Sequence, residues 1–436
     1  MTAGLHGTET ARPNPQSFPT RIAALLERWP SIGLVLWVAG LLRVASIFVL
    51  RSYRHPITWE FGAIADRIRA GFGYTVPLPG GGTAPSAYMP PAYSWVLVAM
   101  LRLGGDRPAT WLALELIQAA LGVLLVYILY RTALLLAERR VAIVAALLVA
   151  VFPTQIYSCN EFHSINFYSV LGAAAVFWLT RYANKSGARK DLFLAAVAMG
   201  LLMLFRAEAP ALVLLFALIL LLRRGWSEVG RAVAFSAVAF LVLAPWTLRN
   251  LLAFHQFVLV TDSAGKNLWI GNNPHATGSE HYPFPQFIPA DIWRACEDAP
   301  RNRDFEITCE DAFKRDSIHF AVTHPAAEVR LAFTKLDYFF VFDPHHDKGR
   351  RPIYWVPSVL LSIAALYGAW LRCRRLLRED AFLVVSVLFA VAVTAAVFAL
   401  PRYKIVIDPF LMFFAASILS RWKPLDLSPG AGTAVR

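Results

Sequence analysis

Long apolar runs alternate with short charged segments along almost the whole chain. Ten runs of about 15 to 22 residues, bounded by charges or prolines, are candidates to cross a bilayer as helices. They lie near residues 32–50, 109–130, 141–157, 164–181, 191–206, 209–222, 231–251, 353–371, 381–399 and 404–420. The pattern predicts an all-α polytopic membrane protein with about ten transmembrane helices.

The distribution of Lys and Arg predicts how these helices are oriented. Basic residues collect in every second loop, as they do in cytoplasmic loops, provided that the apolar stretch from Pro91 to Leu103 does not cross. That stretch is too short to span and follows Pro90, so we expect an interfacial or re-entrant helix. Both termini are then cytoplasmic, and the chain is expected in the cell inner (plasma) membrane.

This threading divides the chain into five parts. A cytoplasmic tail (1–31) precedes an N-terminal transmembrane domain (32–251), which contains a first outer loop (51–108). A periplasmic or extracellular segment (252–352) reads as a small insertion domain and is followed by the C-terminal transmembrane helices (353–420) and a cytoplasmic tail (421–436). In the first outer loop, Ile57, Phe61, Ile64 and Ile68 recur at helical spacing, so we expect an amphipathic helix with its apolar stripe in the lipid.

Composition supports a membrane protein and excludes a soluble enzyme. Of the 436 residues, 57% are hydrophobic and only 16% are charged, and the mean hydropathy is +0.50. The net charge of +13 comes mostly from Lys and Arg at the ends of apolar runs, so nucleic acid is not an expected partner. Two of the four cysteines, Cys296 and Cys309, fall in the outer segment, where we favour a disulfide worth about 3 kcal/mol over two free thiols.

Glu60 is the acid that we single out as a candidate general base. It lies on the amphipathic helix of the first outer loop, at a bilayer surface where water is scarce. A solvated charge that stabilises the helix N-terminus explains the same residue equally well.

Several cations are predicted at the outer ends of spans. Arg206 can pair with the neighbouring Glu208, whereas Arg249, Arg402 and Lys404 can either snorkel to headgroups or bind a phosphate. Four cations at one depth favour a shared anionic ligand over four separate explanations. Glu161, on another outer turn, is either a helix cap or a group that orients a substrate.

Other chemistry has weak support. Asp343, His345, His346 and Asp347 offer metal-ligand side chains, but their spacing matches no zinc motif, and we predict no metal. The chain has no P-loop, dinucleotide-binding glycine pattern, metalloprotease helix motif or nucleophile elbow, and no cofactor is expected.

Five stretches together resemble the GT-C fold membrane glycosyltransferases that use polyprenyl-phosphate sugars, the superfamily of protein O-mannosyltransferases and lipid A aminoarabinose transferases. The matching stretches are 59–65 with 71–74, 83–93, 245–250, 268–274, and 401–404 with Asp408 and Pro409. They occur in family order over most of the chain. Two departures are that the family often has Asp or an Asp-Glu pair at position 60, and that its aminoarabinose branch has Lys where this chain has Met89.

The resemblance implies an outer-facing active site and an inverting transfer of a hexose or pentose from a polyprenyl-phosphate donor. Glu60 falls at the position of the acid that activates a protein, lipid or glycan acceptor. Basic residues hold the lipid phosphate, and the substrate-binding set is expected to comprise Tyr88, Glu161, Arg206, Arg249, Arg402, Tyr403 and Lys404. One carboxylate suffices for a single inverting displacement, and a retaining mechanism has only Asp66 as a second candidate.

Two other functions remain open from the sequence. A secondary transporter of a small anionic solute also has many spans, but it is expected to show inverted repeats and no large outer insertion. A membrane transpeptidase would rest on Cys159, His163 and Arg206, whose spacing permits such a site without indicating it.

Overall fold

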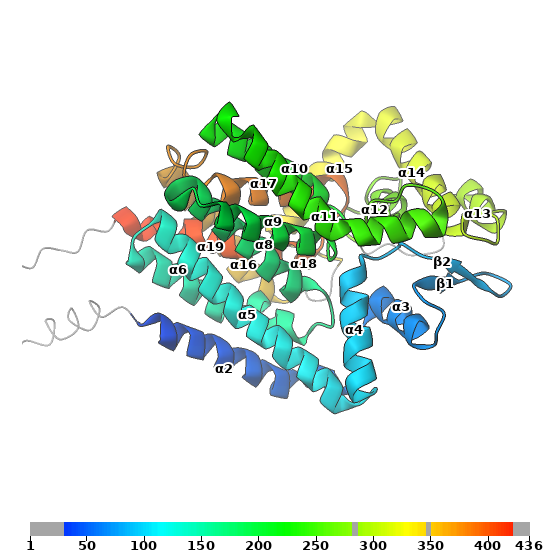
Figure 1. Cartoon of the computed structure of the whole chain (residues 1–436), viewed down its shortest axis with the longest axis horizontal. Coiled ribbons are helices and arrows are strands. Elements are labelled where there is room, and N and C mark those ends of the chain that lie inside the picture. Colours follow the sequence, from blue (N-terminus) through cyan, green and yellow to red (C-terminus); the bar gives the residue numbers. More distant parts are fainter. Residues whose placement is uncertain (1–29, 281–286, 346–349, 422–436) are drawn as a thin grey trace, which may run out of the picture.

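The computed structural model describes residues 30–280, 287–345 and 350–421. The predicted terminal tails, apart from residues 30, 31 and 421, therefore lie outside the described residues, as do His346 and Asp347. The described chain is a bundle of long helices with shorter elements gathered at one end, on the right in Figure 1.

Each of the ten predicted spans coincides with a helix or a pair of helices of the bundle. These are α2 (Ile32–Leu50), α5 (Pro108–Leu136), α6 (Arg139–Val151), α7 (Pro153–Tyr157), α8 (Ile165–Arg181), α9 (Arg189–Met203), α10 (Ala209–Arg224), α11 (Val229–Phe254), α16 (Pro352–Leu371), α17 (Ala381–Ala396), α18 (Pro401–Ile405) and α19 (Asp408–Ala416).

Fewer of these helices meet the length and hydropathy expected of a complete span. Within the described residues, four do: α2, α5, α16 and the stretch Trp226–Phe254 that contains α11. The pair α6 and α7 makes a fifth if its 57° bend lies within one span. The structure thus shows a membrane protein with at least four candidate spans, and the predicted count of about ten is not confirmed.

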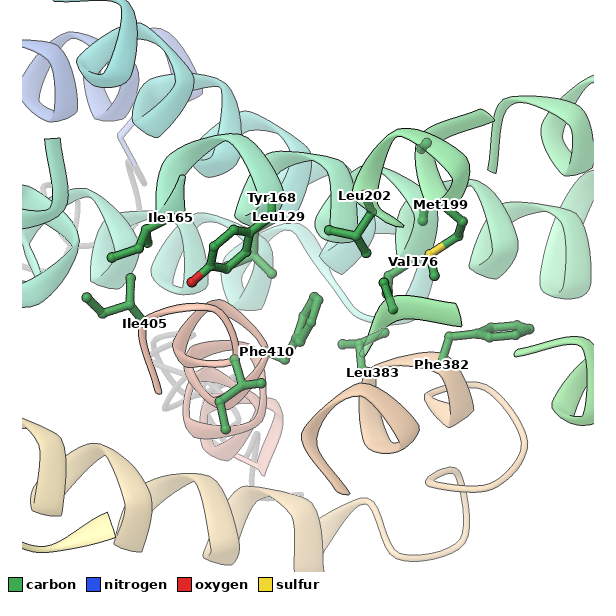
Figure 2. Packing of buried hydrophobic residues seen from close by; sticks show 14 of the residues in the cluster. Leu129, Ile165, Tyr168, Val176, Met199, Leu202, Phe382, Leu383, Ile405 and Phe410 are labelled. Carbon is green, nitrogen blue, oxygen red and sulfur yellow. The ribbon is translucent and has the colours of Figure 1, made fainter. Parts of the chain in front are cut away.

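The interior of the bundle is continuous and apolar. Helix α8 packs on α5 and α9, α9 packs on α11, and α19 packs on α6 and α16. Close approach requires a small residue at Gly200, where a Cβ would lie 2.7 Å from the carbonyl oxygen of Ala239. Figure 2 shows side chains from segments far apart in the sequence meeting in this core, among them Tyr168, Leu202 and Phe410.

The first outer loop folds against the end of the bundle. It contains α3 (Trp59–Arg69), an antiparallel hairpin of β1 (Thr75–Pro77) and β2 (Thr83–Pro85), and α4 (Pro91–Gly104), a 14-residue helix that begins with proline at its first position. The prediction that the α3 stripe lies in lipid is wrong. Phe61, Ile64 and Ile68 are buried within the protein, because α4 packs on α3 and covers them; only Ile57 is exposed.

The outer segment is a small helical unit. It contains α12 (Ala264–Gly271), α13 (Ala290–Glu297), α14 (Phe305–Thr323) and α15 (Pro325–Phe340). A disulfide joins Cys296 of α13 to Cys309 of α14, with Cα atoms 4.8 Å apart. Helix α15 packs on α17 and α18, so this unit rests on the C-terminal part of the bundle.

Candidate functional site

An arginine surrounded by aromatic rings lies at the end of the bundle that carries the outer segment. Arg206, in the turn between α9 and α10, forms an ion pair with Glu208, and its Nε donates to Glu208 Oε1 at 2.6 Å. The guanidinium lies 4.8 Å from the ring centroid of Tyr168 and 5.2 Å from that of Tyr403. We call Tyr168, Arg206, Glu208, Arg402 and Tyr403 the Arg206 cluster. It joins the predicted site residues of two distant turns.

Arg402 keeps an unused donor within this cluster. One terminal nitrogen donates to Glu280 at 3.2 Å. Its Nε is buried and has no hydrogen-bond partner within the described part of the chain. A buried guanidinium nitrogen without a hydrogen-bond partner destabilises the folded state. An incoming anion would supply the missing acceptor.

His163 links the Arg206 cluster to the first outer loop. Its ring is buried and lies 5.4 Å from the ring of Phe61, which follows Glu60 on α3. Burial lowers the pKa of His163 well below its usual value, and the nearby charges of Arg402 and Arg206 lower it further. The imidazole is therefore neutral at physiological pH and adds no positive charge to the site.

A narrow apolar groove leads away from the Arg206 cluster into the bundle. It encloses about 90 Å³ between α8, α9, α10, α17 and α19. Its polar end is formed by Tyr168, Arg206, Glu208 and Tyr403, and its walls include Leu202, Leu212, Phe216, Phe389, Val393 and Phe410. Figure 2 shows Tyr168 and Leu202 on one side of this region and Phe410 across from them. An apolar groove with a cation at its mouth suits an amphiphile that has an anionic head.

Glu60 occupies the first turn of α3 and is exposed. Among the described residues it forms no ion pair, so the structure does not join it directly to a predicted cation. The preceding residue, Trp59, has a φ of 51°, a backbone conformation that is unfavourable for a bulky side chain and that often marks a functional turn.

Tyr88 lies between Glu60 and the outer segment. Burial raises the pKa of Tyr88 strongly, and the charges of Glu310 and Glu60 raise it further. Lys266 Nζ lies 5.4 Å from the ring centroid. The phenol therefore stays protonated.

Sequence reasoning missed three carboxyl groups near Tyr88. Glu306 Oε1 accepts a hydrogen bond from Ala87 N at 2.6 Å, and Glu310 Oε2 accepts one from Lys266 N at 2.8 Å. Burial raises the pKa of Asp262 to about 9, with the Glu306 charge adding to the effect, and burial raises the pKa of Glu310 to about 7. Glu306 and Glu310 are four residues apart and therefore share one face of α14. Like charges at this spacing destabilise a helix, and this pair was the signal in the sequence that could have indicated the buried carboxyl groups.

Two of these carboxyl groups, those of Glu306 and Glu310, border a second cavity. It encloses about 410 Å³ between the β1–β2 hairpin and the helices α13 and α14. Glu306, Glu310, Tyr88 and Lys266 contribute its polar lining, and Ile292, Trp293, Phe305, Phe313 and the disulfide contribute apolar walls. The cavity joins the first outer loop to the outer segment.

Arg249 and Lys404, both predicted to bind phosphate, are committed to the protein in this structure. Arg249 donates to the carbonyl oxygens of Tyr74 at 2.5 Å and Ser86 at 2.7 Å, and so holds the first outer loop against α11. Lys404 is buried and donates to Ser358 and Ser362 of α16. Since a lysine amine has three donors, these bonds leave none for a ligand. A direct role in donor binding remains a prediction for both residues.

The remaining candidates lie near the site without joining the Arg206 cluster. Glu161 hydrogen-bonds Tyr157, and its charge acts on Tyr93. The thiol of Cys159 is buried beside Ser46 and Asn160, an enclosed position that gives a nucleophile no access to substrate.

Metal-ligating side chains do not gather in the described ranges. In residues 30–280, 287–345 and 350–421, no group of three or more His, Cys, Asp or Glu could hold an ion. Asp343 instead accepts hydrogen bonds from the Ser279 hydroxyl and from His345 N.

The fold is that of the GT-C membrane glycosyltransferases. The oligosaccharyltransferase of Archaeoglobus fulgidus superposes with a TM-score of 0.53 at 14% identity, over 88% of this chain and 48% of that chain. The same archaeal enzyme, AglB, in complex with an inhibitory peptide and a dolichol-phosphate gives 0.52 at 15% identity, over 91% of this chain and 50% of that one. This chain thus spans about half the length of that enzyme.

The sequence carries a more specific signature over its N-terminal half. Residues 88–248 match the family described as dolichyl-phosphate-mannose-protein mannosyltransferase. ArnT from Cupriavidus metallidurans bound to undecaprenyl phosphate matches with a TM-score of 0.44 and 16% identity, over 89% of this chain and 78% of that chain. No curated protein sequence matches the chain. The family signature and the archaeal fold match confirm the predicted resemblance to GT-C glycosyltransferases.

Proposed function

We propose that the protein is an inverting glycosyltransferase that moves a sugar from a polyprenyl-phosphate donor to an acceptor at the outer face of the membrane. The observation that carries the proposal is the apolar groove that ends at Arg206 and Tyr403. A polyprenyl phosphate has the matching chemistry, a long apolar chain with one anionic head. The mannosyltransferase signature over residues 88–248 and the dolichol-phosphate bound by AglB support the same donor class.

The donor phosphate would be held by Arg402 together with Arg206. Arg206 is paired with Glu208 and Arg402 with Glu280, but the buried Nε of Arg402 has no hydrogen-bond partner among the described residues and can donate to a phosphate oxygen. These cations stabilise the negative charge that develops on the phosphate oxygen as it leaves.

Glu60 would act as the general base. It takes the proton from the acceptor nucleophile, the nucleophile forms a bond to the anomeric carbon, and the bond from that carbon to the phosphate oxygen breaks. Polyprenyl phosphate leaves with the bonding pair, and the sugar inverts its anomeric configuration because only one displacement occurs. Tyr88, which lines the second cavity and whose pKa is raised by the charge of Glu60, would orient the acceptor or the sugar.

The location at the outer face rests on the distribution of basic residues. Arg181, Lys185, Arg223 and Arg372 lie at the ends of α8, α10 and α16, and Asn184 joins these ends through hydrogen bonds to Arg223 and to the Glu379 carbonyl oxygen. Arg206, at the groove, precedes the other end of α10. Since Lys and Arg mark cytoplasmic loops, the groove mouth faces the periplasm or the cell exterior, and both termini lie in the cytoplasm.

The experiment is transfer of labelled mannose from polyprenyl-phosphate mannose by the full-length chain in membranes, with endogenous acceptors. Glu60→Gln should reduce transfer by at least about a hundredfold, the usual contribution of a general base. Asp66→Asn is the matched control, because Asp66 lies on the same helix and its side chain is 69% exposed. Near-normal transfer by Glu60→Gln would remove Glu60 from the mechanism, and loss of transfer in Asp66→Asn would indicate a second catalytic carboxylate.

A secondary transporter of a small anionic solute is the alternative. The outer segment docked on the first outer loop favours the transferase, because alternating access needs a path that such a fixed cover would obstruct. Uptake of a labelled solute into vesicles that carry the chain, without any transfer of sugar, would decide for transport.

A further inference from the structure

A third cavity lies at the end of the bundle opposite the candidate site. It encloses about 610 Å³ where four helix ends meet. Its lining residues come from the end of α5, the turn after α8, the end of α10 and the loop between α16 and α17: Leu134, Leu135, Leu136, Ala137, Glu138, Ala183, Asn184, Lys185, Arg223, Arg375 and Glu379. The donor groove and the outer segment contribute nothing to it.

The turn after α8 is a π-helix, Tyr182–Ser186, which ends at Gly187 with a φ of 58°. Short π-helical segments are uncommon and occur frequently at functional sites. This one aims Asn184 at two neighbouring segments: its Nδ2 donates to the carbonyl oxygen of Glu379 at 3.0 Å, and its Oδ1 accepts from Arg223 Nη2 at 2.5 Å. The cavity wall is therefore held in place by side-chain contacts.

Arg223 has a donor that this wall does not use. Nη2 is fixed by Asn184, whereas Nη1 is buried and has no hydrogen-bond partner within residues 30–280, 287–345 and 350–421. A guanidinium that is held rigidly with one donor unpaired is well suited to a phosphate oxygen, because the planar fork matches phosphate geometry.

The other charges of the cavity favour an anion. Lys185 and Arg375 also line it, and of its two carboxylates Glu379 is paired with Arg375 at 3.7 Å. Both side chains of that ion pair are exposed and the distance between them is long, so the pair is weak. An anionic ligand can therefore replace Glu379 as the partner of Arg375. Apart from that pair, two cations, Lys185 and Arg223, face one carboxylate, Glu138, which is exposed and forms no ion pair with another described residue.

We propose that this cavity binds the phosphate group of an anionic lipid. The cavity lies at the ends of apolar helices that include the candidate span α5, and so at the depth of the headgroups of the leaflet opposite the transfer site. Basic pockets between transmembrane helices bind anionic headgroups by the same chemistry. The proposal does not rest on the proposed function, because the cavity shares no lining residue with the donor groove.

The test uses the full-length chain in phosphatidylcholine nanodiscs, with and without phosphatidylglycerol. Retained phosphatidylglycerol is counted by native mass spectrometry, and the thermal unfolding midpoint is recorded for each lipid composition. Removing one headgroup cation should weaken binding about fivefold, so Arg223→Gln should retain less lipid and lose the rise in unfolding midpoint. Arg375→Gln should act in the same direction, and it cannot disturb the core because Arg375 is exposed.

Arg378→Gln is the matched control, an exposed arginine of the same loop that does not line the cavity. A second arm replaces the lipid by inorganic phosphate in neutral detergent. Stabilisation by phosphate that Arg223→Gln abolishes would confirm the phosphate site and identify a soluble source in place of the lipid. Equal lipid retention in the parent and Arg223→Gln, or equal losses in Arg223→Gln and Arg378→Gln, would overturn the proposal.

Discussion

Lys335 Nζ donates a hydrogen bond to Asn272 Oδ1 at 2.6 Å, and this buried pair joins the outer segment to the end of α17. Lys335 also donates to the carbonyl oxygen of Ala395 at 3.1 Å, and Asn272 Nδ2 donates to that of Ala396 at 2.8 Å. The last carbonyl groups of a helix have no partners within the helix, so the pair satisfies groups that would otherwise be buried without a bond. The backbone beyond them leads directly to Arg402.

Lys335→Met should therefore displace the turn that carries Arg402. The substitution retains much of the apolar stem but leaves the Asn272 Oδ1 and the Ala395 carbonyl oxygen without the hydrogen bonds from Lys335. This loss should lower the free energy of unfolding by about 1 to 3 kcal/mol. We expect a lower thermal unfolding midpoint together with a raised KM for the polyprenyl-phosphate donor. Lys314→Met, at an exposed position of α14, should change neither quantity. A lower midpoint with an unchanged donor KM would show that Lys335 stabilises the fold without positioning Arg402.

Gly271→Ala tests the same junction through the backbone. A Cβ at position 271 would lie 1.5 Å from the carbonyl oxygen of Val397, so the outer segment and the end of α17 would have to separate. Overpacking of this kind costs about 1 to 3 kcal/mol or more, and the loss should appear in thermal unfolding. Gly172→Ala is the control, because nothing lies within 4 Å of a Cβ there. Equal stability of the two variants would contradict the close approach.

Arg402→Ala should impair use of the donor more than use of the acceptor. Its buried Nε is the unpaired donor of the Arg206 cluster, and loss of the guanidinium should remove phosphate stabilisation of about 2 to 4 kcal/mol in the transition state. Transfer rates measured while donor and acceptor are varied separately would show a larger fall in kcat/KM for the donor. Equal effects on both substrates would count against a phosphate contact.

Glu310 should make the stability of the outer segment depend on pH. Burial raises the pKa of Glu310 to about 7 from its usual value of 4.5, so the folded chain binds more protons than the unfolded chain between these values. The contribution of Glu310 to the free energy of unfolding is therefore largest below pH 4.5. It falls by on the order of 3 kcal/mol as the pH rises to about 7. Unfolding followed between pH 5 and 8 should show a smaller loss in Glu310→Gln than in the parent chain. If the parent chain and Glu310→Gln lose stability equally over this pH range, a group other than Glu310 causes the pH dependence.

Local pattern was enough to locate the helices and to indicate the class of protein. Hydropathy depends on residues that are close together in the sequence, and it locates all ten apolar runs directly. The breaks at prolines and the order of the motifs can likewise be read from the sequence. The same pattern could not say where each helix ends, because the turns between helices also make contacts with distant residues, as the guanidinium of Arg206 does with the ring of Tyr403.

Partner choice was decided only by the tertiary structure. Sequence alone predicted one site, with Glu60 on the first outer loop and four cations at the outer ends of spans: Arg206, Arg249, Arg402 and Lys404. The fold commits Lys404 to Ser358 and Ser362 and Arg249 to the first outer loop, leaving Arg402 with a donor unpaired among the described residues. Packing of α4 on α3 turned a stripe expected in lipid into core. The physical reason is that a hydrogen bond or a packing contact needs two groups. The sequence specifies the chemistry of each group, whereas the tertiary structure decides which two groups meet.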